Sequence, residues 1–219
     1  MFSVPAGKKS PRMNGMDDQP FSSGIIERLE AAEQLKLGGE FQHAITILEQ
    51  VLVEDPQNVS ALEEVADNEL SLEHYSRARA AAEQAIALDP KSYTGHYILG
   101  FLGSQEEDWE KALTHLQESN KLKPNNAEIL RCLGWTLFNS GKRAQGIVTL
   151  ERSLNLESTN PLTLCDLGVA YLQTHNVFKA KTLFQRTLEL DPENERAKEC
   201  VQAVLRLEEG VQRTRVRQS

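Results

Sequence analysis

The sequence is poor in aromatic residues and has no long hydrophobic run. Aromatic side chains make up 6% of the 219 residues, whereas leucine and alanine are abundant, a balance that favours helices. No stretch approaches the roughly 18 apolar residues of a membrane-spanning helix, and residues 1–13 lack the apolar segment of a secretory signal. We therefore expect a helical protein with neither a membrane span nor a secretory signal.

Cysteine is also scarce, which argues against a disulfide scaffold. The three cysteines, Cys132, Cys165 and Cys200, are odd in number and show no Cys-x-x-Cys spacing. Such a set supplies neither a disulfide framework nor a structural zinc site. We expect reduced thiols buried in helices, and these predict a reducing compartment, the cytoplasm.

Charge is unevenly distributed along the chain. The net charge is −8, but residues 24–209 carry −12, residues 1–23 carry +1 and residues 210–219 carry +3. An acidic body repels a phosphate backbone, so we expect no nucleic-acid binding. The three arginines of the last ten residues are interpreted as a solvated terminus rather than as a site for an anionic surface.

The prolines reveal an internal repeat. Pro56, Pro90 and Pro124 are 34 residues apart, and Pro192 follows after twice that interval. Two residues beyond this place, each unit has a side chain of the type that caps helix N-termini. These side chains are Asn58, Ser92, Asn126, Asn160 and Asn194. Cutting the chain at this phase gives five units, 25–58, 59–92, 93–126, 127–160 and 161–194.

Small residues recur at two fixed places in these units. The eighth and twentieth places hold only alanine or glycine, which lets two helices approach closely. The eighth places are Ala32, Ala66, Gly100, Gly134 and Gly168, and the twentieth places are Ala44, Ala78, Ala112, Gly146 and Ala180. Turn signals fall between the two places, as at Gly38-Gly39 and Ser140-Gly141. Each unit therefore predicts a helix, a short turn and a second helix, which the proline place then stops.

Together with the closing Leu-Asp-Pro of residues 88–90 and 190–192, this pattern resembles the tetratricopeptide repeat (TPR) family. The resemblance covers residues 25–194. It implies an all-α fold, a right-handed α-solenoid of five helix-turn-helix repeats. The fourth unit departs from the pattern at Gly146 and Ser158, which predicts looser packing there.

The segments outside the repeats have distinct compositions. Stacked repeats leave an exposed apolar face at the end, so we expect residues 195–209 to form a capping helix that closes the solenoid of residues 23–209. Residues 1–22 are rich in Pro, Gly, Ser and Asp and predict a disordered lead, with Ser22 or Ser23 capping the first helix. Residues 210–219 predict a basic, disordered tail that begins at Gly210.

No catalytic, cofactor-binding or metal-binding motif is found in the sequence. The glycines at Gly134 and Gly141-Lys142 are too far apart for a phosphate-binding loop. The five histidines occupy unrelated places in the repeat and have no metal-ligand spacing. Cys132 and His115 lack a supporting acidic or amide residue in register. We therefore expect no enzymatic activity, no cofactor and no metal.

The resemblance implies that the first helix of each repeat lines a concave groove that binds partners. We expect the second, fifth, ninth, twelfth and thirteenth places of each unit to face this groove. In units three to five these places form an apolar and aromatic cluster with one arginine at its edge, a composition typical of binding hot spots. Its members are Tyr97, Phe101, Arg131, Trp135, Phe138, Val169 and Leu172. In the second unit the same places hold the acidic Glu63 and Asp67.

Three interpretations of this cluster are open: packing between helices, contact with the chain's own N-terminal lead, and binding of a partner. Some of the aromatic side chains, Phe101 and Phe138 especially, also fit a role in packing between neighbouring helices. The lead itself, through Phe2, Val4 and Phe21, is long enough to reach the groove at about 3.3 Å per residue. A partner segment is the other occupant.

The sequence thus predicts a protein-interaction scaffold or adaptor that binds an extended or helical segment of a protein or peptide partner. The acidic second unit would select a basic flank on that segment. No three successive units carry the Lys, Asn and Arg with which some family members grip a C-terminal carboxylate, so a chaperone-tail adaptor is not expected. The alternative is a structural subunit that assembles into a homo-oligomer through the same surface.

Overall fold

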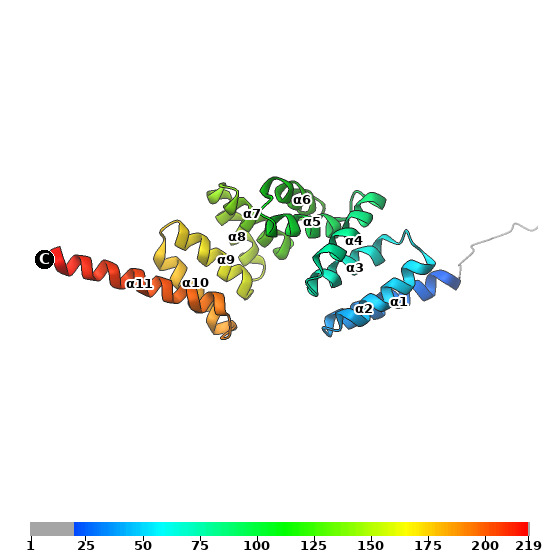
Figure 1. Ribbon diagram of the computed structural model, residues 1–219, viewed down its shortest axis with the longest axis horizontal. Helices are drawn as coiled ribbons and strands as arrows, with labels where there is room; N and C mark the ends of the chain where they lie inside the picture. Colours follow the sequence, from blue (N-terminus) through cyan, green and yellow to red (C-terminus); the bar gives the residue numbers. More distant parts are fainter. Residues whose placement is uncertain (1–19, 219) are drawn as a thin grey trace, which may run out of the picture.

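The computed structural model describes residues 20–218, which form eleven α-helices and no β-strand (Figure 1). In chain order these are α1 (Pro20–Leu37), α2 (Phe41–Glu54), α3 (Val59–Ser71), α4 (Tyr75–Leu88), α5 (Tyr93–Gln105), α6 (Trp109–Leu122), α7 (Ala127–Asn139), α8 (Arg143–Leu156), α9 (Pro161–Gln173), α10 (Val177–Leu190) and α11 (Glu195–Gln218). The predicted all-α solenoid of five helix pairs and a closing helix is confirmed. Residues 1–19 of the predicted lead lie outside the described residues.

The five predicted capping residues each precede a first helix directly. Asn58, Ser92, Asn126, Asn160 and Asn194 stand immediately before α3, α5, α7, α9 and α11. The side-chain oxygen of each accepts a hydrogen bond from a backbone N–H of the first turn. Each bond satisfies an N–H group that the helix itself leaves unpaired. The predicted helix starts are therefore confirmed.

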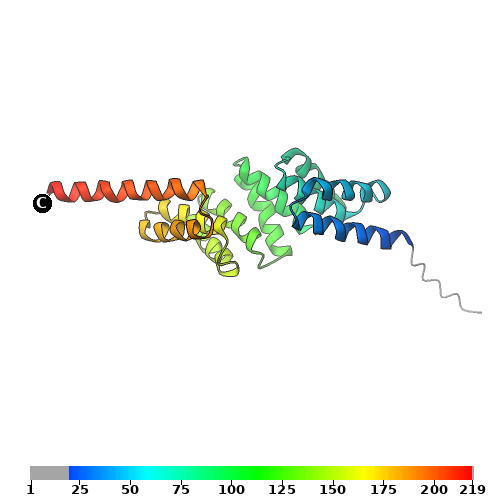
Figure 2. The same ribbon diagram turned by 90° about the horizontal axis from the view of Figure 1, so that it is seen from below.

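The helices form two layers that wind along one arch. Each first helix packs on the second helix of its own repeat and also contacts the first helix of the next repeat. Neighbouring second helices in residues 20–218 have no close backbone contact, although side chains bridge them, as where Arg77 on α4 pairs with Glu49 on α2. Because the inner layer of a curved stack is the crowded one, the odd-numbered helices line the inner face and the even-numbered helices the outer face (Figures 1 and 2).

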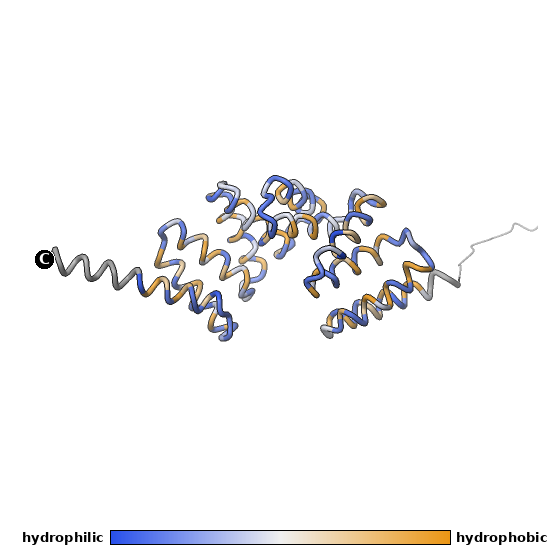
Figure 3. The backbone as a smooth tube through the Cα atoms, viewed as in Figure 1, coloured by the Kyte–Doolittle hydropathy of each residue, from blue (hydrophilic) through white to orange (hydrophobic). Residues whose placement is uncertain are grey.

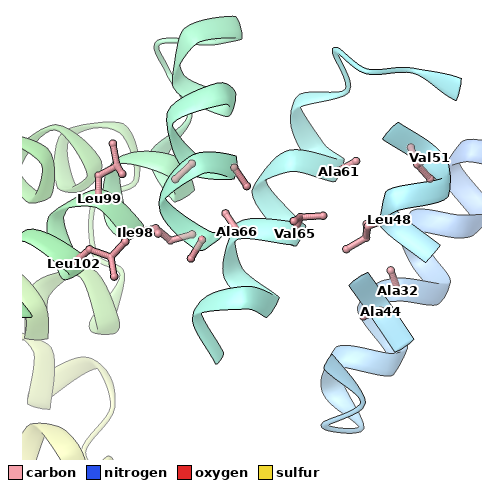
Figure 4. Packing of buried hydrophobic residues seen from close by; sticks show 13 residues of the cluster. Ala32, Ala44, Leu48, Val51, Ala61, Val65, Ala66, Ile98, Leu99 and Leu102 are labelled. Atoms are coloured by element: carbon pink, nitrogen blue, oxygen red, sulfur yellow. The ribbon is translucent and has the colours of Figure 1, made fainter. Parts of the chain in front are cut away.

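Small residues bring the two helices of a repeat together. Ala32 and Ala44 are fully buried and lie side by side where α1 meets α2 (Figure 4). Larger side chains such as Leu48 and Val65 fill the space between this pair of helices and α3. Buried hydrophobic residues form successive clusters along the stack, over residues 32–102, 113–137 and 138–204. Hydrophobic residues recur at short intervals along the helices rather than in one run (Figure 3). Within residues 20–218, no helix is long and apolar enough to cross a membrane.

The fourth repeat packs more closely than predicted, not more loosely. A Cβ atom added to Gly146 on α8 would lie 2.6 Å from the backbone nitrogen of Phe138 and 2.7 Å from the carbonyl oxygen of Gly134 on α7. Glycine at both places removes both β-carbons from the crossing, so the two backbones come nearer than alanine allows. Ser158 in the proline place leaves the boundary unchanged, since α8 still ends at Leu156.

Both ends of the solenoid differ from the prediction. Helix α1 begins at Pro20, so Ser22 and Ser23 lie within it instead of capping it. Proline is well suited to the first turn of a helix, where its missing N–H costs nothing. Helix α11 does not stop at Gly210 but continues to Gln218. A single glycine costs a helix only about 1 kcal/mol, and no proline follows it.

The Gly134–Gly146 contact leads to a stability prediction. Gly146→Ala introduces the residue found at this place in the other four repeats, yet here its β-carbon meets backbone atoms that cannot move aside. We expect a loss of about 1–3 kcal/mol of unfolding free energy, measured by urea denaturation. Gly24→Ala is the matched control, because its β-carbon meets nothing within 4 Å, and it should leave stability equal or slightly higher. Equal effects of the two substitutions would contradict the close approach.

Candidate functional site

Five of the predicted groove residues lie on three consecutive first helices of the inner face. Tyr97 and Phe101 belong to α5, Trp135 to α7, and Val169 and Leu172 to α9. All five are half-buried, so each keeps part of its side chain at the surface. The rings of Tyr97 and Phe101 lie 6.4 Å apart, centroid to centroid, and both also pack against core residues. We call these five residues the inner strip.

Phe138 does not belong to the inner strip. Its side chain is 2% exposed and packs in the core with residues such as Leu150 and Phe184. The packing interpretation is therefore correct for Phe138, and its prediction as a groove residue is wrong. The cause is Gly146, which leaves room beside the backbone of Phe138 for a close crossing of α7 and α8.

A chain of polar contacts runs beside the inner strip and joins four first helices. The Tyr97 hydroxyl donates to Glu128 Oε1 at 3.0 Å, and Arg131 Nε donates to Glu128 Oε2 at 2.9 Å. Arg131 Nη1 donates to Asp166 Oδ2 at 2.9 Å, and Arg196 Nη1 donates to Asp166 Oδ1 at 2.8 Å. These five residues, which we call the polar ladder, connect α5, α7, α9 and α11.

Three groups of the polar ladder, Tyr97, Glu128 and Arg131, have pKa values shifted from the usual ones. Burial alone would raise the pKa of Glu128, but its hydrogen bonds with Arg131 and the arginine's charge hold it below the usual value. The pKa of Arg131 is raised despite burial, chiefly because Glu128 accepts its hydrogen bonds. Burial raises the pKa of Tyr97, which therefore remains a hydrogen-bond donor. Glu128 and Arg131 thus form a fixed ion pair rather than two titrating groups.

Arg131 was predicted at the edge of the site and lies instead inside the ladder. Its side chain is only 13% exposed, and its guanidinium is bound to both Glu128 and Asp166. The partner that the sequence reasoning did not include is Asp166, whose side chain is 4% exposed. An acidic residue in the apolar run 161–172 was the signal that could have identified it.

Trp135 is partly covered by the last helix. The Arg196 guanidinium carbon lies 5.0 Å from the centroid of the Trp135 ring, a cation–π distance, while the same guanidinium binds Asp166. Sequence reasoning assigned α11 only a capping role. Arg196 occupies the second place after Asn194, and this is a groove-facing place when the repeat is continued by one unit.

The two predicted acidic groove residues are already engaged within the protein. Asp67 Oδ2 accepts from the Lys36 ammonium group at 3.1 Å, and Glu64 beside it accepts from the same nitrogen at 2.6 Å. Glu63 accepts a hydrogen bond from the hydroxyl of Ser92, the residue that caps α5. The second repeat therefore presents less free negative charge to the groove than its composition suggests.

Two hollows differ in place and character. A small hollow of about 180 Å³ lies on the inner face, where Lys36, Asp67, Tyr97 and Glu128 form part of its wall. A larger one, of about 470 Å³, lies on the outer side between α8 and α10, where Phe178 is 83% exposed. Neither hollow has the grouped catalytic side chains of an enzyme site.

The surroundings of the thiols and histidines considered as catalytic candidates do not support a catalytic role. Burial raises the pKa of Cys132, so its thiol is protonated and unreactive at neutral pH. His115 Nδ1 lies 3.0 Å from His96 Nδ1 rather than beside Cys132. Within residues 20–218, no three His, Cys, Asp or Glu side chains are grouped so that they could hold a metal ion.

Helix pairs that repeat every 34 residues, with their first helices on the inner face, define an α-solenoid repeat protein. Residues 65–127 match the family model described as Tetratricopeptide repeat. This segment belongs to the tetratricopeptide repeat family, and the other helix pairs of the chain share its 34-residue period. Proteins of this family are generally scaffolds for protein interactions without catalysis of their own.

Curated relatives agree with this assignment. A TPR repeat-containing protein of Pseudomonas aeruginosa is 31% identical over 133 residues, 60% of this chain and 54% of the relative. The BBSome complex member BBS4 homolog of Drosophila melanogaster is 24% identical over 164 residues, 74% of this chain and 34% of the relative. The chain thus spans about a third to a half of the length of these two relatives.

Solved structures share the fold. The Thermus thermophilus TPR protein TTC0263 has a TM-score of 0.65 and 24% identity, covering 83% of this chain and 98% of its own. YrrB, described as a TPR protein with an unusual peptide-binding site, has a TM-score of 0.58 and 20% identity, covering 83% of this chain and 97% of its own. At these identities the likeness concerns the fold alone.

Asp166 is expected to be the residue on which the polar ladder depends. Asp166→Ala leaves two arginines without their shared carboxylate, one of them, Arg131, in a largely buried position. We expect a loss of about 3 kcal/mol of unfolding free energy in urea denaturation followed by circular dichroism. Glu54→Ala is the control, since it breaks the exposed Arg28–Glu54 pair and should have little effect. A small loss for Asp166→Ala would show that the ladder contributes little.

Glu63 allows a test with pH. Burial raises the pKa of Glu63, and Asp89 and Glu64 add to the rise, although the hydrogen bond from Ser92 opposes it. The folded state therefore holds this proton to higher pH than the unfolded chain does, and its contribution to stability is lost as pH rises through the folded pKa.

Glu63→Gln keeps an acceptor for Ser92 but removes the charge. Relative to the parent, we expect equal stability at acidic pH and a gain of less than about 1 kcal/mol at neutral pH, measured by urea unfolding at several pH values. Glu64→Gln is the contrasting variant, because it weakens the contact with Lys36 and should lower stability at neutral pH. If Glu63→Gln raised stability equally at all pH values, the result would contradict a raised pKa of Glu63 in the folded state.

Proposed function

We propose that the protein is an interaction scaffold that binds a segment of a partner protein along the inner face of repeats three to five. The observation that carries the proposal is the inner strip, in which five half-buried apolar or aromatic side chains follow one another on α5, α7 and α9. A surface of this kind on a repeat protein supports partner binding, because binding energy concentrates in a few aromatic anchors.

The polar ladder supports the same proposal through rigidity. Its ion pairs join α5, α7, α9 and α11, so the helices that bear the strip are held in one arrangement before a partner arrives. A preorganised surface loses less entropy on binding than a mobile one. Trp135 is the proposed centre, and a partner segment would either pack beside the Arg196 guanidinium or displace it.

The proposed partner segment is apolar and either extended or helical. A preference for a basic flank is a weaker part of the proposal, because Asp67 and Glu63 have partners within the protein. The peptide-binding site in the description of YrrB and the complex membership of the BBS4 homolog are in keeping with such a role. We propose no catalytic activity, and the unpaired, buried thiols of Cys132 and Cys165 favour a reducing compartment such as the cytoplasm.

The rival function is self-assembly through the inner strip. It would bury the strip between copies and leave no surface for a partner. Light scattering after size-exclusion chromatography separates the two, since self-assembly through the strip requires a mass that falls when Trp135 is replaced by alanine. A mass unaffected by that replacement excludes this rival.

Trp135→Ala should remove the main anchor of partner binding. Capture from native extract with mass spectrometry identifies the partner, and calorimetry on the recovered pair then measures affinity. We expect a loss of about 2 kcal/mol or more, roughly thirtyfold, with helix content unchanged. Trp109→Ala on α6 is the matched control, because it makes the same replacement in an outer-layer helix.

Normal binding by a folded Trp135→Ala variant would contradict the proposed site. Loss of binding by Trp109→Ala alone would move the site to the outer face.

A further inference from the structure

The two ends of the solenoid carry opposite charge. Residues 25–92, the first two repeats, contain fourteen acidic and five basic residues, a net charge of −9. The last ten residues contain Arg213, Arg215 and Arg217 and no acidic residue, a net charge of +3. Helices α1 and α2 lie at one end of the arch and the C-terminus of α11 at the other (Figure 1). The complementary charges therefore do not meet within one molecule.

The acidic end has an apolar groove on its outer face. This groove, which we call the acidic groove, has a volume of about 430 Å³ and lies between α2 and α4, with Leu52, Leu62 and Leu88 in its wall. Val53, next to the groove residue Leu52 in the chain, is 83% exposed. The groove thus offers apolar surface that nothing in residues 20–218 covers.

Three acidic residues without a cationic partner belong to the segments that form this groove. Asp55, Glu83 and Asp89 are adjacent in sequence to the groove residues Pro56, Gln84 and Leu88. None of the three forms an ion pair with a described residue, whereas the nearby Glu49 and Glu54 are paired with Arg77 and Arg28. An apolar groove at a strongly acidic end of the molecule is complementary to a helix that carries both apolar and basic residues.

Helix α11 of this same chain has that composition at its free end. It is 24 residues long, about 36 Å at 1.5 Å per residue, and its last turns extend beyond the repeats (Figure 2). Val211 and Val216 lie there among the three arginines. We propose that the end of α11 of one molecule docks in the acidic groove of a second copy.

Such a contact is heterologous, because it joins different surfaces of the two copies. Each molecule keeps a free groove at one end and a free helix at the other, so association continues head to tail unless the geometry closes a ring. The contact depends on opposite charges at the surface, so salt weakens it. It uses neither the inner strip nor the polar ladder and is therefore independent of the proposed partner site.

Sedimentation velocity of the full chain tests this association. At low salt the average mass should rise with protein concentration, and at high salt it should return to that of the monomer. Two variants should each remain monomeric at low salt. One carries Arg213→Glu, Arg215→Glu and Arg217→Glu, and the other carries Val53→Lys and Glu83→Lys.

A mixture of the two variants makes the test specific. The reversed helix end of the first complements the reversed groove of the second, and their unaltered surfaces still match, so mixing should restore association. Val148→Lys with Glu157→Lys is the control, since it makes the same charge change on exposed residues of the fourth repeat and should associate like the parent.

Three outcomes would overturn the proposal. The first is a parent protein that stays monomeric at low salt. Binding of this monomer to vesicles containing phosphatidylserine would then show that the end of α11 recognises a membrane surface instead of a second copy. The second is association that survives the arginine replacements. The third is a mixture of the two variants that remains monomeric. Trp135→Ala should associate like the parent, so failure here is distinct from failure of the proposed partner site.

Discussion

The close approach of two helices at the eighth and twentieth places of each repeat is the constraint on which the rest of the structure depends. Only alanine or glycine occupies these places, and at each of the glycines an added β-carbon would lie 2.6–2.8 Å from an atom of the partner helix. The approach sets how each second helix packs on its first helix. It thereby sets the spacing at which one repeat stacks on the next, and hence the arch. The two glycines of the fourth repeat take this constraint furthest.

The inner layer follows from that stacking. Because first helices contact first helices along the whole arch, side chains of residues about 30 positions apart meet there. The polar ladder forms across these contacts and gives the inner face a fixed electrostatic pattern. Desolvated ion pairs of this kind are expensive to break, since removal of one partner leaves a buried charge unpaired. The ladder therefore couples the last helix to the middle of the solenoid through Asp166.

The surfaces of the protein divide into two kinds. The inner face has aromatic side chains in a rigid setting, and we propose it for partner recognition. The outer face has apolar hollows between second helices, whose backbones make no close contact with one another within residues 20–218. The strong difference in charge between the first repeats and the end of α11 lies along the length of the molecule. A repeat architecture keeps such a difference, because distant repeats do not touch.

The sequence by itself determined the repeat, its phase and the starts of α3, α5, α7, α9 and α11. These depend on local chemistry: a cap such as Asn126 acts within one turn of α7, and a small residue such as Ala44 acts within one helix pair. Half of the candidate site was also predictable, since Tyr97 and Trp135 lie on the inner face where the repeat phase placed them.

Only the tertiary structure decided which polar groups pair with one another and which aromatic side chains are covered. Phe138 is buried because Gly146 lies opposite it on another helix, and Arg131 is occupied because Asp166 lies one repeat further on. Asp67 is bound by Lys36 from the preceding repeat. Repeat phase gives the direction of a side chain but not the identity of its neighbour, and that neighbour decides whether a charge or a ring remains free for a partner.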